Sequence, residues 1–143
     1  MIVDISIHSF SLWHHFAHKP GFDAIAFADL ARSMGYQGIS LSLNDTNYRH
    51  LGGRDSARME RLFEHLITHG MSLEVDTSGT APAHMSEMLK VAHRLGATSL
   101  RTYTHHKGDV LRMTKRTTSD LAAVVNEASD LGIIIVLENH EDF

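Results

Sequence analysis

Cysteine, long apolar runs and an excess of positive charge are all missing from this sequence of 143 residues. The absence of cysteine excludes disulfides, thiolate metal sites and cysteine nucleophiles. No apolar run approaches the length of a membrane span, and the opening MIVDISIHSFSLWHH has neither the basic start nor the long apolar core of a signal peptide. We therefore expect a cytoplasmic protein with no membrane partner.

The charge balance argues against nucleic acid as a partner. Lysine and arginine number 13 against 17 aspartates and glutamates, so the formal net charge is -4 and no basic surface is implied. Histidine is abundant instead, with 12 residues, and imidazole suits metal binding and acid–base chemistry. Because 43% of the residues are hydrophobic and no linker divides the chain, we expect a single domain over 1–143.

Four segments share one layout, in which an amphipathic helix is followed by a glycine and an apolar strand. Apolar residues recur in the helices at i, i+3, i+4 and i+7, so each helix should bury one stripe against a flat surface. Glycine adopts the left-handed conformation that commonly ends a helix. The four glycines are Gly35, Gly70, Gly96 and Gly132.

The repeat predicts five strands, over 2–8, 38–43, 71–76, 98–104 and 133–138. The last strand is apolar on both faces, which is typical of a parallel sheet covered by helices. Two α/β folds begin with this alternation, the doubly wound sheet and the (β/α)8 barrel. A doubly wound sheet normally closes with a helix after its fifth strand, whereas this sequence reaches Phe143 soon after that strand.

The segment after the first strand also favours the barrel. It reads SFSLWHHF, where a dinucleotide-binding fold would have a glycine-rich phosphate loop. We therefore predict the α/β class and the first half of a (β/α)8 TIM barrel, from its first strand through its fourth helix to its fifth strand. The five strands should lie in sequential order, with all four helices on the convex side.

Glu138 is the strongest candidate for a functional residue. It ends the most apolar strand, where a buried carboxylate is costly unless it is paired. The carboxyl ends of barrel strands form the mouth of the active site. Carboxylate and imidazole ligands suit Mn, Mg, Co or Zn, so a divalent metal ion is the predicted partner of Glu138.

The ending IVLENHEDF resembles the fifth strand of xylose isomerase-like TIM barrels, which include sugar phosphate isomerases and epimerases. The opening IVDISIHSFSL and the step GYQGISL are similar to the same family. The resemblance implies metal-dependent isomerisation or epimerisation, or a related dehydration, of a small sugar-like carbonyl compound through an enediolate. It also implies that Glu138 is both a metal ligand and a catalytic group in proton transfer.

The resemblance covers the whole chain but only about half of the family's barrel. The family's other metal ligands lie at the ends of strands six, seven and eight. An isolated chain of 143 residues is therefore not expected to be active.

Other residues near the predicted strand ends are candidate substrate contacts. In a barrel these positions face the mouth of the active site, where a sugar would bind. Trp13 has two interpretations, as an apolar wall for a sugar ring or as a packing residue. The candidates are His8, Trp13, Asp76, His105 and His140.

Several polar residues receive structural interpretations. Arg101 lies inside the fourth predicted strand and needs an anion, for which Glu74 on the neighbouring strand is the candidate. His14, His15 and His18 are expected in an exposed loop.

Two alternatives to the isomerase remain open. One is an abasic-site endonuclease of the same fold with a zinc cluster, against which the acidic net charge argues. The other is a non-catalytic half-barrel that pairs with another chain. Open sheet edges at the first and fifth strands predict a homo-oligomer or another association through those edges.

Overall fold

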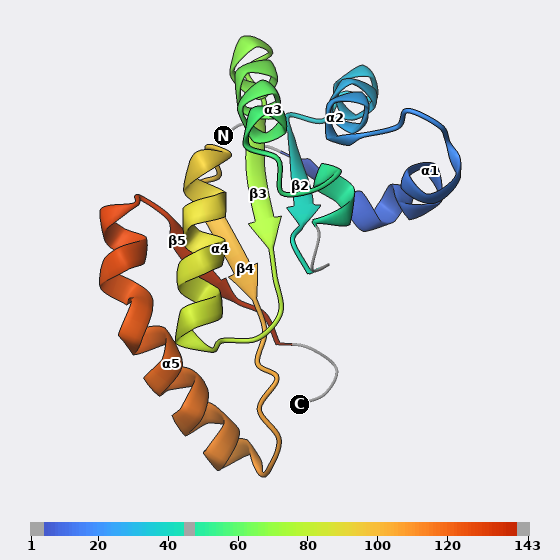
Figure 1. The fold of residues 1–143 in the computed structure, drawn as a ribbon. Helices are drawn as coiled ribbons and strands as arrows, with labels where there is room; N and C mark the ends of the chain where they lie inside the picture. Colours follow the sequence, from blue (N-terminus) through green and yellow to red (C-terminus); the bar gives the residue numbers. More distant parts are fainter. Residues whose placement is uncertain (1–4, 45–47, 140–143) are drawn as a thin grey trace.

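A five-stranded parallel sheet forms the centre of the molecule (Figure 1). The structure is a computed structural model that describes residues 5–44 and 48–139. The strands lie in the order β1-β2-β3-β4-β5, and every neighbouring pair is parallel. This order confirms the predicted barrel arrangement and contradicts a doubly wound sheet, whose order is not sequential. The strands are β1 (Ser6–His8), β2 (Gly38–Ser42), β3 (Ser72–Asp76), β4 (Ser99–Thr102) and β5 (Ile134–Leu137).

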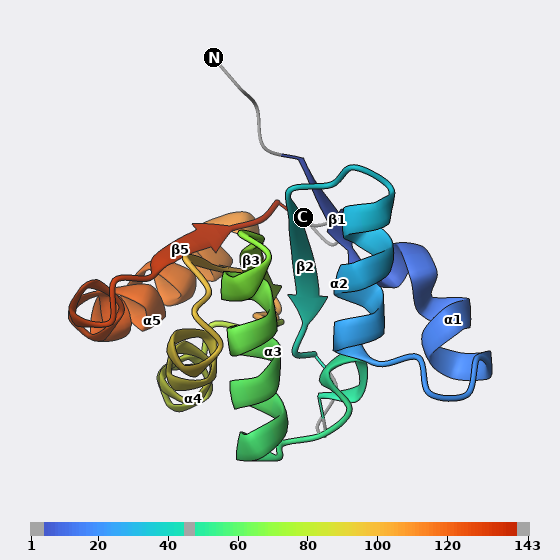
Figure 2. The same ribbon diagram turned by 90° about the horizontal axis from the view of Figure 1, so that it is seen from above.

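The helices lie together on one side of this curved sheet, as predicted (Figure 2). None of the helices in the described ranges is long and apolar enough to cross a membrane. The helices are α1 (Trp13–His18), α2 (Ala24–Ser33), α3 (Ser56–Thr68), α4 (Pro82–Arg94) and α5 (Val110–Asp130), with 3-10 turns η1 (Ser9–Leu12) and η2 (Arg49–Leu51).

The helices begin and end at residues that satisfy free backbone groups. Asp23, Asp55 and Asp109 accept hydrogen bonds from backbone N–H groups in the first turns of α2, α3 and α5. Pro82 begins α4, where its missing N–H has no cost. The four glycines of the predicted repeat all have positive φ just after α2, α3, α4 and α5. These local signals explain why the repeat could be recognised from the sequence.

Helix α1 corrects one prediction. His14, His15 and His18 were expected in an exposed loop, but they lie in this short helix. The segment 9–19 contains neither glycine nor proline, so nothing interrupts its coiling. Phe16 anchors the helix by packing its ring against Phe22, at a centroid distance of 5.0 Å.

The hydrophobic core lies between the sheet and the helices. Alternate residues of β2, β3 and β4 point into it, among them Ile39, Val75 and Leu100, all fully buried. Phe27 of α2 and Leu89 of α4 meet them from the helical layer.

On β1 to β4, the opposite, concave face of the sheet is polar and carries small side chains, whereas β5 adds Ile134 and Val136 to it. The register places Ser6, Gly38 and Ser72 side by side at one level of the three neighbouring strands. The hydroxyl groups of Ser6 and Ser72 close over Gly38 and leave no room there for a Cβ atom. Ser40 and Ser99 flank Glu74 at the next level. The interior of this half-barrel therefore differs from the bulky aliphatic filling that is usual in TIM barrels.

Strand β5 differs from its prediction. Its apolar sequence predicted burial on both faces, yet Ile134 is 68% exposed, Val136 41% and Leu137 48%. Ile134 and Val136 lie beside Ser99 and Arg101 and so face the concave side, which the helices do not cover. Strand β5 is also the last strand of the described sheet and pairs only with β4. Helix α5 covers part of one face, and Ile133 just before the strand is buried.

Candidate active site

Four charged or polar side chains form a connected network, the charged network, at the carboxyl ends of the strands. His8 Nε2 lies 2.6 Å from Asp76 Oδ2, which links β1 to β3. Arg101 Nη2 lies 3.9 Å from the same oxygen, and Arg101 Nη1 lies 3.1 Å from Glu138 Oε2. Arg101 thus joins the His8–Asp76 pair to Glu138. This brings three of the predicted site residues together across the sheet.

Asp76 is the buried centre of the charged network. Its side chain is only 7% exposed, and a buried carboxylate needs partners to offset its desolvation. Asn44 Nδ2 donates to Asp76 Oδ1 at 3.2 Å, so both carboxylate oxygens are engaged. His8 Nδ1 accepts the N–H of Phe10, which leaves the hydrogen of the neutral ring on Nε2 and makes His8 a donor to Asp76.

Glu138 is fixed by its backbone and by one cation. Its N–H donates to the Thr102 carbonyl at 2.8 Å, which continues the pairing of β5 with β4 one residue beyond the strand. The side chain is 36% exposed and pairs with Arg101.

The partner of Arg101 corrects the sequence prediction. Glu74 was the expected partner, but Arg101 pairs with Asp76 and Glu138. The register explains the difference, because Asp76 lies opposite Arg101, while Glu74 lies opposite Ser99. Two residues along a strand correspond to about 6.6 Å, which places Glu74 too far towards the amino end of the sheet.

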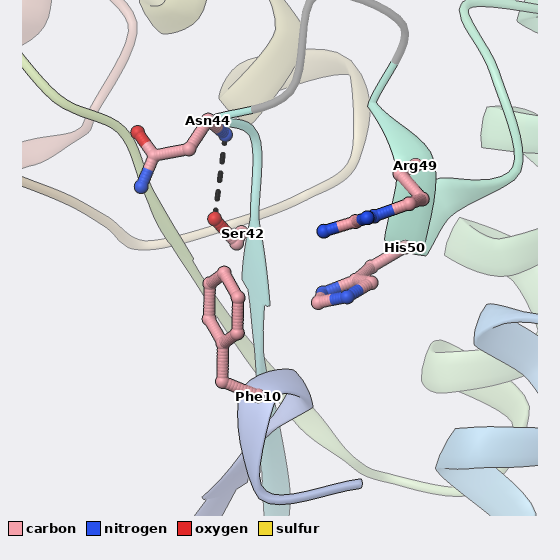
Figure 3. Close-up of a pocket in the computed structure, with 5 residues that line it drawn as sticks. All are labelled: Phe10, Ser42, Asn44, Arg49 and His50. Carbon is pink, nitrogen blue, oxygen red and sulfur yellow. Dashed lines mark hydrogen bonds between the residues drawn. The ribbon is translucent and has the colours of Figure 1, made fainter. Parts of the chain in front are cut away.

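A pocket opens beside the Asp76 carboxylate. It encloses about 210 Å³ and is lined by Phe10, Ser42, Asn44, Arg49 and His50. Figure 3 shows the side chains of Arg49 and His50 reaching from η2 towards Phe10 and Ser42, which lie on the opposite wall. Because Asn44 lines the pocket and also donates a hydrogen bond to Asp76, the pocket and the charged network form one site.

The pocket walls are held by a hydrogen bond and by ring contacts. His50 is 3% exposed, and its Nδ1 lies 2.7 Å from the hydroxyl oxygen of Ser9. Phe16 stacks on the His50 ring at 4.5 Å, and Phe10 meets it edge-on at 5.0 Å. Phe10 also stacks on His8, with their ring centroids 5.5 Å apart, and so connects the pocket wall to the charged network.

The remaining predicted site residues lie elsewhere. Trp13 is 48% exposed on α1, where it packs against His14 at a ring distance of 3.7 Å. His105 lies beside the loop between β3 and α4 and lines a separate pocket of about 250 Å³ with His84 and His106. His140 lies outside the described residues.

The pocket residues Phe10, Ser42, Asn44, Arg49 and His50 were not singled out from the sequence. The available signal was the long segment after β2, because loops that follow strands carry function in α/β proteins. That signal does not identify side chains. The orientation of His50 depends on Ser9, which is 41 residues away in the sequence.

The predicted metal ion can be tested against the donor set. Within 5–44 and 48–139, no group of three histidine or carboxylate ligands includes Glu138, and the guanidinium of Arg101 balances its charge. Zinc sites have three or four protein ligands, and harder cations take more oxygen ligands. Glu138 therefore has the chemistry of one ligand, while the described part of the chain does not complete a metal site around it.

Known proteins share this fold. No family model matches the sequence. An uncharacterized protein, YihM of Escherichia coli (strain K12), is 24% identical over 114 residues, which are 80% of this chain and 35% of that protein. The chain thus spans about a third of this relative's length.

Among solved structures, a D-psicose 3-epimerase studied with D-fructose superposes with a TM-score of 0.75 at 14% identity over 96% of this chain and 55% of the epimerase. A D-tagatose 3-epimerase-like protein gives a TM-score of 0.70 at 14% identity, over 99% of this chain and 54% of its own. IolI, a protein with a bound zinc atom, gives 0.68 at 13% identity over 94% and 51%.

The structural matches define an α/β fold that corresponds to half of a TIM barrel. At the level of the fold, this agrees with the resemblance seen in the sequence. The chain spans about half the length of these structures, and identities of 13 to 14% show the fold alone.

Proposed function

We propose that this chain forms the N-terminal half of the active site of a metal-dependent sugar or sugar phosphate isomerase or epimerase. The observation that supports the proposal is the chain of contacts from His8 through Asp76 and Arg101 to Glu138. It lies at the end of the sheet where TIM barrels carry out their chemistry, and it adjoins a pocket with both polar and aromatic side chains in its wall. In this proposal, residues 1–143 form a single domain that is the N-terminal part of a complete barrel. The protein is located in the cytoplasm.

The pocket has the chemistry to bind a small polyhydroxy compound. The hydroxyl of Ser42 and the amide of Asn44 offer both donors and acceptors to sugar hydroxyl groups. Phe10 supplies an apolar face for the C–H side of a sugar. Arg49 is suited to a phosphate group, so its presence in the pocket wall extends the proposal to sugar phosphates.

Glu138 is proposed as the catalytic residue and as a metal ligand. A divalent cation, Mn, Mg, Co or Zn, would polarise the substrate carbonyl and stabilise the negative charge of an enediolate. Glu138 would move a proton at the carbon next to that carbonyl, and Arg101 would hold the carboxylate in place. His8, Asp76, Trp13, His105 and His140 are proposed as substrate contacts.

The rest of the barrel must come from other strands. Within the described sheet, β1 and β5 each pair on one side only, so both edges are open to further strands. These strands, and the missing metal ligands, would be supplied by further residues of the same polypeptide or by a second copy of the chain in a homo-oligomer.

The substitution Glu138→Gln tests the proposal, because it removes the charge and keeps the shape. In the complete barrel, exchange of a ketose C–H proton with solvent deuterium in the presence of Mn²⁺ should fall by about 100-fold or more, because proton transfer alone contributes that much. The variant should still fold, since a partly exposed ion pair is worth only about 0–1 kcal/mol.

The matched control is Glu74→Gln. Glu74 is an exposed carboxylate on the same concave face, nearer the amino end of the sheet. It should leave the exchange rate and the metal content unchanged. Wild-type exchange and metal content in the Glu138→Gln protein would overturn the assignment of Glu138.

A further inference from the structure

A second group of metal-ligating side chains lies in the helical layer, remote from Glu138. Asp29 belongs to α2, His65 to α3, and His69 follows α3 directly. One ligand atom from each of the three lies within 4.8 Å of the others. Because His69 precedes β3, this group is near the amino end of the sheet, whereas the candidate active site is at the carboxyl end.

The spacing of the two histidines suits a metal ion. Residues four apart on a helix lie one above the other on the same face, and two histidines at that spacing are a known zinc-binding arrangement. The rings of His65 and His69 have a centroid distance of 4.6 Å. Ligand atoms of a tetrahedral zinc ion are about 3.4 Å apart, given metal–ligand distances near 2.1 Å. The three ligand atoms, which lie within 4.8 Å of one another, would close to that separation on binding, and the His69 side chain is exposed and can turn.

An ion pair alone explains only part of this arrangement. His65 Nε2 lies 3.0 Å from Asp29 Oδ1, and Arg32 Nη2 lies 3.8 Å from the same oxygen. That pairing does not account for His69, which turns its ring towards His65 without a carboxylate partner of its own in this group. The side chain of Asp29 is 48% exposed and that of His65 20%, so an ion can reach both from solvent.

We propose that Asp29, His65 and His69 form a zinc-class transition-metal site that links α2 to α3. Two imidazoles and one carboxylate are the donor set that such ions prefer, and water would complete the coordination. The proposal is independent of the isomerase function. Asp29 and His65 are 36 positions apart in the sequence, so the unfolded chain does not hold the ligands together, and the ion binds the folded state and stabilises it.

Calorimetric titration of the full chain with ZnCl₂ in chelator-treated buffer tests the site. The wild-type chain should bind one ion, and its melting temperature should rise with zinc. Loss of an outer partner of a metal ligand already costs about 10–100-fold in affinity, so His69→Ala and Asp29→Asn should each lose at least about 100-fold. Both changed side chains are partly or fully exposed, and circular dichroism verifies that the variants fold.

The matched control is the double variant His14→Ala/His18→Ala. These histidines are also four residues apart on a helix, with rings 5.8 Å apart, but no carboxylate joins them in a three-ligand group of the described residues. This variant and Glu138→Gln should both keep zinc affinity and the rise in melting temperature. The proposal is overturned if the wild-type chain does not bind zinc, if His69→Ala binds it normally, or if either control loses it.

Discussion

Asp76 and Arg101 show how single residues organise the candidate site. Asp76 is the ordinary last residue of a strand, yet its two oxygens contact side chains from three separate segments of the chain. Arg101 in turn forms an ion pair with Glu138, which follows β5, and so fixes the position of its carboxylate. The position of the proposed catalytic carboxylate therefore depends on a cation that sequence reasoning treated as purely structural.

Tyr48 carries the clearest electrostatic signature among single residues. Burial raises the pKa of its phenol above the ordinary value of 10.0, and the hydrogen bond that it donates to Glu87 raises the pKa further. The folded state thus favours the neutral phenol. Its contribution to stability is fully present below pH 10.0 and is lost as the pH rises through the higher pKa of the folded state.

An absorbance titration of phenolate formation should therefore show a late component that ionises above the ordinary pKa of tyrosine. The substitution Tyr48→Phe should remove that late component. Glu87→Gln should shift it towards lower pH, because it removes the negative charge near the phenol. A wild-type titration that lacks this late component would contradict the expected shift.

At the scale of elements, the tight packing around Gly38 makes a testable prediction. A Cβ atom at this position would meet the hydroxyl groups of Ser6 and Ser72 on the two neighbouring strands. Gly38→Ala should therefore lower the free energy of unfolding by about 1–3 kcal/mol, the usual cost of overpacking.

Urea denaturation measures this loss, and Ser72→Ala in the same chain provides the internal control. Removing the Ser72 hydroxyl should recover part of the stability, although the Ser72 carbonyl stays 2.9 Å from the added carbon. A double variant no more stable than Gly38→Ala would show that the hydroxyl contact is not the cause.

The elements also show what the sequence could and could not predict. The positions of all five strands and four of the helices followed from periodicity and terminal glycines, which act within a few residues. Strand order followed from the alternation of elements. The missed features depend on distant neighbours, such as the ion pairs of Arg101, the pocket around His50 and the exposure of β5.

At the scale of the whole molecule, the open edge at β5 makes a prediction about association. Ile134 and Val136 on one face and Leu137 on the other leave apolar side chains exposed on a strand that pairs on one side only in the described sheet. The chain of 143 residues should therefore self-associate when produced alone. Sedimentation velocity should show species larger than a monomer.

A lysine on this edge should weaken the association. Ile134→Lys places a charge on a strand residue that is 68% exposed, whereas Ile67→Lys makes the same change on helix α3 at a residue 63% exposed. Only the first should shift the sedimentation profile towards monomer. A compact wild-type monomer that binds no apolar dye would be inconsistent with an exposed edge.

The sequential strand order also bears on how the chain folds during synthesis. Paired strands are separated by only about 25 to 35 residues, as between Ser6 and Gly38 or between Ser99 and Ile134. Each new strand therefore finds its partner already translated when it leaves the ribosome. Since polypeptides emerge at about 5–20 residues per second, each helix–strand repeat has a few seconds to dock before the next is complete. The molecule can grow from its amino end one repeat at a time, without waiting for a distant segment.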